Sequence, residues 1–132
     1  MAHESKHKTS VLIAGRPCRM RDSLYFLLKT MPGIEVIGHA DNSVSAIEMV
    51  SELHPVLALL DTNLPNGGAV TIVRQIKTNG TPNRCLVLAG DTQQQREATE
   101  AGADAALLKG CSAAEIFQAI QELLAETHRT TR

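Results

Sequence analysis

Residues 57–65 read LALLDTNLP, an apolar run that is followed at once by Asp61 and then by a turn with a proline. An unbroken apolar run of this kind is typical of a parallel strand that is buried on both faces of a sheet. An aspartate at the tip of such a strand stands at its carboxyl end, where open α/β sheets place their ligand sites. The stretch therefore predicts a buried central strand with a candidate functional residue at its end.

Short apolar runs and longer amphipathic segments alternate on both sides of this stretch. The predicted strands cover residues 11–14, 34–38, 56–60, 85–89 and 105–108. Apolar residues at helical spacing predict a helix after each strand. Strands that alternate with helices predict a parallel sheet covered by helices on both faces, with right-handed crossovers.

Local signals mark where several of these helices begin. Asn42 or Ser43 can cap the second helix, and residues 112–115 have the pattern of a capping box ahead of the last one. The fourth helix, over residues 91–101, is mostly polar, and we interpret its charged and amide side chains as a solvated face.

The composition limits the class of protein. The 132 residues fit one domain, and 43% apolar residues suffice for a core. A net charge of -1 and an aromatic content of 2% give neither the basic patch nor the stacking surface of a nucleic-acid-binding protein. Cys18, Cys85 and Cys111 form no metal-binding pattern and are expected to be reduced thiols.

The termini are predicted to lie outside the domain. We expect a flexible N-terminal tail over residues 1–9, a domain over residues 10–127 and a C-terminal tail over residues 128–132. The first nine residues have no apolar signal-peptide core, and no segment is long enough to span a bilayer. These features favour a cytoplasmic protein without membrane contact.

Three stretches together resemble the receiver domains of bacterial response regulators, most closely those of the nitrate-response type. They are LALLDTNLP at residues 57–65, EAGADAALLKG at residues 100–110 and MPGIEVIGHA at residues 31–40. The resemblance covers about residues 10–125. It implies a doubly wound, flavodoxin-like α/β fold with strand order 2-1-3-4-5, and a role in a two-component phosphorelay without enzymatic activity.

The resemblance also implies a phosphorylation site. In the family, an aspartate at the end of the third strand accepts a phosphoryl group from a histidine kinase, and here this position is Asp61. A lysine after the fifth strand pairs with that group, and here it is Lys109. Phosphoryl transfer depends on positioning and charge neutralisation, which the family achieves with Mg²⁺ held by the same aspartate and two further acids.

Four positions of this chain depart from the family pattern. The two acids after the first strand fall on Gly15 and Arg16. The hydroxyl residue after the fourth strand falls on Ala89, and the aromatic switch residue of the fifth strand falls on Ala106. Signalling through a rotating aromatic ring is therefore not expected.

The charges that remain are unfavourable for a metal ion. Asp61, Lys109 and Arg16 carry a net charge of about +1, whereas the family's three carboxylates and one lysine carry about −2. We therefore expect Mg²⁺ to bind weakly or not at all, and no other cofactor is indicated. The Arg16 guanidinium is predicted to pair with Asp61 in the place of the metal.

These features predict an atypical receiver domain that signals through protein–protein contacts, with Mg²⁺-dependent phosphorylation of Asp61 weak or absent. Its expected partner is a sensor histidine kinase or another signalling protein, and a homodimer is left open. The alternative is a phosphorylation-competent regulator that uses Asp61 with a dedicated kinase, as a fragment of a DNA-binding regulator. A small nucleotide-binding protein or enzyme is disfavoured, because the first strand is followed by neither GxGxxG nor a P-loop.

Overall fold

The fold is a five-stranded parallel sheet with helices on both faces. The computed structural model describes residues 9–65, 68–80 and 82–130, with the backbone alone for residues 126–130. The strands are β1 (Thr9–Ala14), β2 (Ile34–Ala40), β3 (Leu57–Asp61), β4 (Arg84–Ala89) and β5 (Ala105–Leu108). The helices are α1 (Arg19–Lys29), α2 (Ser43–Leu53), α3 (Gly68–Thr78), α4 (Thr92–Ala101) and α5 (Ala113–Thr130). The strand order is β2-β1-β3-β4-β5, which confirms the predicted topology.

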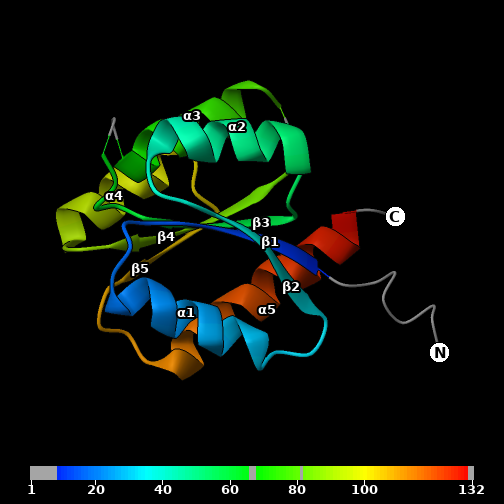
Figure 1. The fold of residues 1–132 in the computed structure, drawn as a ribbon. Coiled ribbons are helices and arrows are strands. Elements are labelled where there is room, and N and C mark those ends of the chain that lie inside the picture. The colour runs from blue at the N-terminus through cyan, green and yellow to red at the C-terminus, as the bar shows by residue number, and fades with distance from the viewer. Residues whose placement is uncertain (1–8, 66–67, 81, 131–132) are drawn as a thin grey trace.

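Two apolar layers hold the sheet between the helices. Figure 1 shows α1 and α5 on one face of the sheet and α2, α3 and α4 on the other. Successive residues of a strand point to opposite faces, so Leu57 and Leu59 pack in one layer while Ala58 and Leu60 pack in the other. Full burial of each leucine side chain contributes roughly 1.5–3 kcal/mol. This is why the strand cannot carry polar groups before its carboxyl end.

Two predicted helix starts are confirmed by their hydrogen bonds. Asn42, rather than Ser43, caps α2, because its side chain accepts a hydrogen bond from Ser45 N at 2.9 Å. The capping box is complete: Ser112 N donates to Glu115 Oε1 at 2.8 Å, and Glu115 N donates to Ser112 Oγ at 3.1 Å. These contacts fix the entry of α5 directly after the loop that carries Lys109.

Some boundaries differ from the sequence prediction. β1 begins at Thr9, and α5 continues to Thr130, so both elements extend into the predicted tails. The remainder of those tails lies outside the described residues, as do residues 66–67 of the predicted turn. β2 continues to Ala40, which pairs with Ala14, after a register shift in the β1–β2 ladder. This longer strand places the following residue, Asp41, at the carboxyl edge of the sheet.

The cysteines are free thiols in different environments. Cys85 is buried in β4, and burial raises the pKa of its thiol to about 12. Cys18 is exposed and Cys111 is partly exposed. In the part of the chain that the structure describes, no helix has both the length and the apolar character needed to cross a membrane.

Asp104 ties three segments together at the amino-terminal edge of the sheet. Its carboxylate lies 2.9 Å from Lys77 Nζ at the end of α3 and 3.3 Å from Arg84 Nη1 of β4. It also accepts a hydrogen bond from Cys85 N at 2.8 Å. The Asp104 side chain is only 15% exposed, so these contacts are shielded from water.

Replacing Asp104 by alanine should therefore destabilise the fold by about 2 kcal/mol, because it leaves a backbone N–H and two cations without this acceptor. Urea unfolding at neutral pH measures the loss. Glu100→Ala, on the exposed face of α4, is the matched control and should change stability by less than about 0.5 kcal/mol. Equal losses in the two variants would contradict the role given to Asp104.

Candidate functional site

The carboxyl edge of the sheet gathers the residues that sequence analysis singled out. Asp61 is the last residue of β3, Gly15 follows β1, and Lys109 follows β5. Ala89 ends β4, the strand between Asp61 and Lys109. These residues are far apart in the sequence and meet because all five strands run in the same direction.

Asp61 and Lys109 form an ion pair at this edge. Lys109 Nζ lies 2.6 Å from Asp61 Oδ1, and the two side chains are 27% and 15% exposed. Asn63 N donates a second hydrogen bond, of 2.8 Å, to the same oxygen. The carboxylate is thus held by one cation and by the backbone of the loop that follows it.

Gly15 lies directly beside Asp61 on the β1 side. An ideal Cβ built on Gly15 would lie 3.3 Å from Asp61 Cβ and 3.8 Å from Asp61 Oδ2. Gly15 is buried, and its N–H donates to Ala40 O of β2 at 2.9 Å. A side chain at this position would therefore reach the Asp61 carboxylate, but glycine supplies only backbone.

The predicted ion pair between Arg16 and Asp61 is wrong for this structure. Arg16 is exposed, and among the described residues the cation paired with Asp61 is Lys109. The physical reason is position along the chain. Gly15 is the residue level with Asp61, and Arg16 comes one residue later, where the chain has already left the sheet.

A different arginine, Arg21 of α1, reaches the carboxyl edge. Its Nη1 donates to Gly15 O at 3.2 Å and to Asp41 Oδ1 at 2.6 Å. The Arg21 side chain is 18% exposed, whereas the Asp41 side chain is 62% exposed. Arg21 Nε is buried and has no hydrogen-bond partner among the residues that the structure describes.

Arg21 and Asp61 share the lining of a very small cavity with Gly15. Its volume is about 10 Å³, which is about the minimum for one water molecule. The rest of its lining is apolar, so it is a small packing gap beneath the edge of the sheet. Arg21 lines this gap together with Gly15, which follows β1. Arg21 therefore lies on the β1 side of Asp61, opposite to the side from which Lys109 approaches.

Sequence reasoning missed Arg21 and Asp41, although one signal was available. Side chains that follow the carboxyl ends of parallel strands converge, and Asp41 follows β2 directly. The predicted strand ended at Gly38, so Asp41 was not recognised as the residue that follows its carboxyl end. Nothing in the sequence marks Arg21, because its contact depends on the length of an arginine side chain crossing from the first turn of α1.

The pocket position Ala89 and the switch position Ala106 carry methyl groups only. Ala89 is buried at the end of β4, and Ala106 is partly buried in β5. The carbonyl of Ala106 accepts a hydrogen bond of 2.8 Å from Gln95 Nε2 of α4. Polar contacts in this region therefore come from the helix rather than from the strands.

Comparison with known proteins agrees with this geometry. The family model described as the response regulator receiver domain matches residues 11–121. The chain is a response regulator receiver domain. The receiver domain is also similar to a solved two-component response regulator of the LuxR family from Aurantimonas sp. SI85-9A1, with a TM-score of 0.83 and 25% identity. That comparison covers 90% of this chain and 86% of the other.

Two curated relatives are longer proteins. The receiver domain is 28% identical over 106 residues to the DNA-binding transcriptional activator DevR/DosR of Mycobacterium tuberculosis, covering 79% of this chain and 49% of that protein. It is 31% identical over 108 residues to the transcriptional regulatory protein YdfI of Bacillus subtilis, covering 81% and 51%. The chain thus spans about half the length of these relatives.

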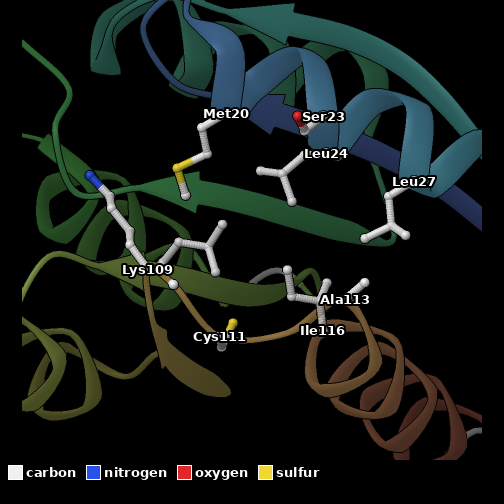
Figure 2. A pocket seen from close by; sticks show the side chains of 10 residues that line it. Met20, Ser23, Leu24, Leu27, Lys109, Cys111, Ala113 and Ile116 are labelled. Atoms are coloured by element: carbon white, nitrogen blue, oxygen red, sulfur yellow. The ribbon is translucent and has the colours of Figure 1, made fainter.

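An apolar cavity lies beside the ion pair in the receiver domain. It has a volume of about 320 Å³ and lies between α1 and the start of α5, with Leu24, Leu27 and Ile116 in its lining. Figure 2 shows Lys109 at its edge, with the amine pointing away from these apolar side chains. The lysine therefore divides a charged region around Asp61 from an apolar one.

The two arginines near this edge allow a matched test. Arg21→Ala should destabilise the receiver domain by about 1 kcal/mol, because it removes a partly buried ion pair and a hydrogen bond to Gly15 O. Arg16→Ala should change stability by less than about 0.5 kcal/mol, because Arg16 is exposed. Urea unfolding of both variants measures the difference. A loss at Arg16 as large as that at Arg21 would refute the assignment.

Proposed function

We propose that this receiver domain signals through protein–protein contacts and that Mg²⁺-dependent phosphorylation of Asp61 is weak or absent. The observation that carries the proposal is the anchored guanidinium of Arg21, which bonds Gly15 O and Asp41 beside the position where the family's acids are missing. The chain thus supplies its own fixed cation at the edge of the sheet. A guanidinium donates hydrogen bonds but cannot coordinate oxygen ligands as a metal ion does.

Charge counting supports this proposal with Arg21 in place of Arg16. The two carboxylates, Asp61 and Asp41, are matched by two cations, Lys109 and Arg21. These four groups therefore sum to a net charge of zero, whereas three carboxylates and one lysine would leave about −2 for a divalent cation to neutralise. The attraction that draws Mg²⁺ into such a pocket is missing.

The donor set does not fit magnesium. Mg²⁺ takes oxygen ligands in octahedral geometry and is usually held by one or two carboxylates. Gly15 brings no carboxylate to the side of Asp61, and its carbonyl already accepts from Arg21. Among the described residues, no group of three or more acidic, histidine or cysteine side chains is placed to hold a metal ion. The proposed signalling therefore does not depend on a bound metal ion.

One observation favours the alternative, a receiver that still accepts a phosphoryl group. The Asp61 carboxylate keeps Lys109 at 2.6 Å and the Asn63 N–H at 2.8 Å. These groups can orient the carboxylate and pair with an added phosphoryl group. A dedicated kinase would then have to supply the charge neutralisation that Mg²⁺, held by the two missing acids, provides in the family.

The expected partners follow from the family. We propose that, in the cytoplasm, a sensor histidine kinase or another signalling protein contacts this domain. The receiver domain itself has no enzymatic activity in this proposal and does not bind nucleic acid directly. The two relatives named as transcriptional regulators, one of them DNA-binding, are about twice as long as the matched region. Output through DNA would therefore belong to a different part of such a protein.

Treatment with a small phosphodonor and Mg²⁺, followed by intact-mass measurement, tests the proposal. The mass of the receiver domain should stay unchanged, as should that of the Asp61→Asn variant, which has no acceptor carboxylate. A proven phosphorylatable receiver in the same tube confirms that the donor is active. A mass increase of one phosphoryl group in the parent, absent from Asp61→Asn, would establish the alternative.

Restoring an acid while removing the fixed cation should create a metal site. The variant Gly15→Asp with Arg21→Ala is expected to bind Mg²⁺ about tenfold or more tightly than the parent, because the charge at the edge becomes negative. The new Cβ would lie 3.3 Å from Asp61 Cβ, so a shift of a few tenths of an ångström accommodates it.

The matched control for this variant keeps Arg21. Gly15→Asp alone adds the same acid, but the new carboxylate can pair with Arg21, so a smaller gain is expected. Titration calorimetry with MgCl₂ measures all three proteins. Tight Mg²⁺ binding by the parent would contradict the charge argument.

A further inference from the structure

Apolar packing alone does little to fix α4. This helix lies against β4 and β5 at one end of the sheet (Figure 1). Of its ten residues, all within the described part of the chain, Ala98 alone is buried. A cavity of about 140 Å³ lies between α4 and the start of α3, with Val70 and Glu97 in its lining. Because little apolar surface is buried, the position of α4 depends on its polar contacts.

Gln94 joins α4 to the loops that follow two strands. Its Oε1 accepts hydrogen bonds from Thr62 Oγ1 at 2.8 Å and from Gly90 N at 2.8 Å. Thr62 directly follows Asp61, and Gly90 directly follows β4. An ideal Cβ on Gly90 would lie only 3.0 Å from the same oxygen, so this oxygen sits tightly against the loop. One side-chain oxygen thus connects three segments.

Gln95 makes a separate contact with β5. Its Nε2 donates to Ala106 O at 2.8 Å. Gln93, by contrast, contacts Glu97 of the same helix at 3.4 Å and so does not reach across. The amide orientations follow from the partners, because a backbone N–H can only donate to Gln94 and a backbone carbonyl can only accept from Gln95.

We propose that Gln94 and Gln95 form a clamp that fixes α4 to the sheet and couples its position to the loop after Asp61. Gln94 bonds the residue after Ala89, and Gln95 bonds the carbonyl of Ala106. The loop after Asp61 cannot move without breaking the clamp or carrying α4 with it. The inference concerns the unmodified protein, so it stands whether or not Asp61 accepts a phosphoryl group.

A local helix cap is the competing explanation for Gln94. Asp91 is the N-cap of α4, and its side chain accepts from Gln94 N at 2.8 Å. A glutamine at this position commonly turns back to bond the N-terminal backbone of its own helix. A cap of this kind would include Gly90 but would make Thr62 unimportant. The bond to Thr62 is therefore the contact that separates a clamp from a cap.

Residue-resolved amide hydrogen exchange, measured by NMR on the untreated protein, tests the clamp. Gln95→Ala and Thr62→Val should each raise the exchange rates of α4 amides about fivefold, the effect of one lost hydrogen bond, and Gln94→Ala, which loses two, should raise them at least as much. Gln93→Ala is the matched control on the same helix and should stay within about twofold of the parent. Amides of β3 report global opening and should exchange at the parent's rate.

Replacement by glutamate distinguishes the two halves of the clamp. Gln94→Glu keeps an acceptor oxygen for Thr62 and Gly90, so α4 should exchange as in the parent. Gln95→Glu loses the only donor and places a carboxylate against Ala106 O, so its effect should equal or exceed that of Gln95→Ala. Neither substitution removes enough side chain to prevent folding.

Three results would overturn the clamp. Unchanged α4 exchange in Thr62→Val would reduce Gln94 to a local cap. Equal effects of Gln93→Ala and Gln94→Ala would show a loss of helix propensity. An equal increase in the exchange rates of α4 and β3 amides would show that these contacts contribute to global stability rather than to the position of α4. None of these readouts uses a phosphodonor or a metal, so their failure is separate from a failure of the proposed function.

Discussion

Parallel pairing sends the carboxyl ends of all five strands to the same edge of the sheet, and the chemistry of this domain depends on that constraint. Apart from the first residues of β1 and β4, the central strands are buried on both faces and carry only apolar side chains up to their carboxyl ends. Asp61 and Lys109 can therefore meet only beyond the last apolar residue. The crossover helices return the chain to the opposite edge each time, and α1 begins close enough for Arg21 to reach back to Gly15 O.

The identity of the cation at this edge changes how the domain can respond. A bound metal ion depends on its concentration in solution, because binding stabilises the occupied state by mass action. The Arg21 guanidinium is covalently attached, and its contact with Asp41 does not vary with metal concentration. On the proposed function, the charge around Asp61 is therefore constant, and signalling must arise from what binds to the surface.

The sequence was sufficient for the fold and for the motif residues, because both depend on local pattern. Apolar runs located all five strands, and the family resemblance of LALLDTNLP and EAGADAALLKG identified Asp61 and Lys109. The Arg16 contact could not be predicted correctly, because alignment identifies a position but not the direction in which the chain leaves a strand. Arg21 was missed because its side chain bonds Gly15 after β1 and Asp41 after β2, and no sequence pattern links these positions.

The predicted solvated face of α4 holds for Gln93, Arg96 and Glu97, which are exposed, but Gln94 and Gln95 turn towards the sheet for a different physical reason. A run of polar residues on a helix is usually solvated, and TQQQRE gives no apolar period to suggest otherwise. Glutamine is long enough, however, to cross from a helix to a neighbouring loop and carries both a donor and an acceptor. Small residues on the strands, Ala89 and Ala106, leave the backbone accessible to such a side chain. The polar contacts at Gly90 and Ala106 are thus made by the amides of Gln94 and Gln95 rather than by side chains of the strands.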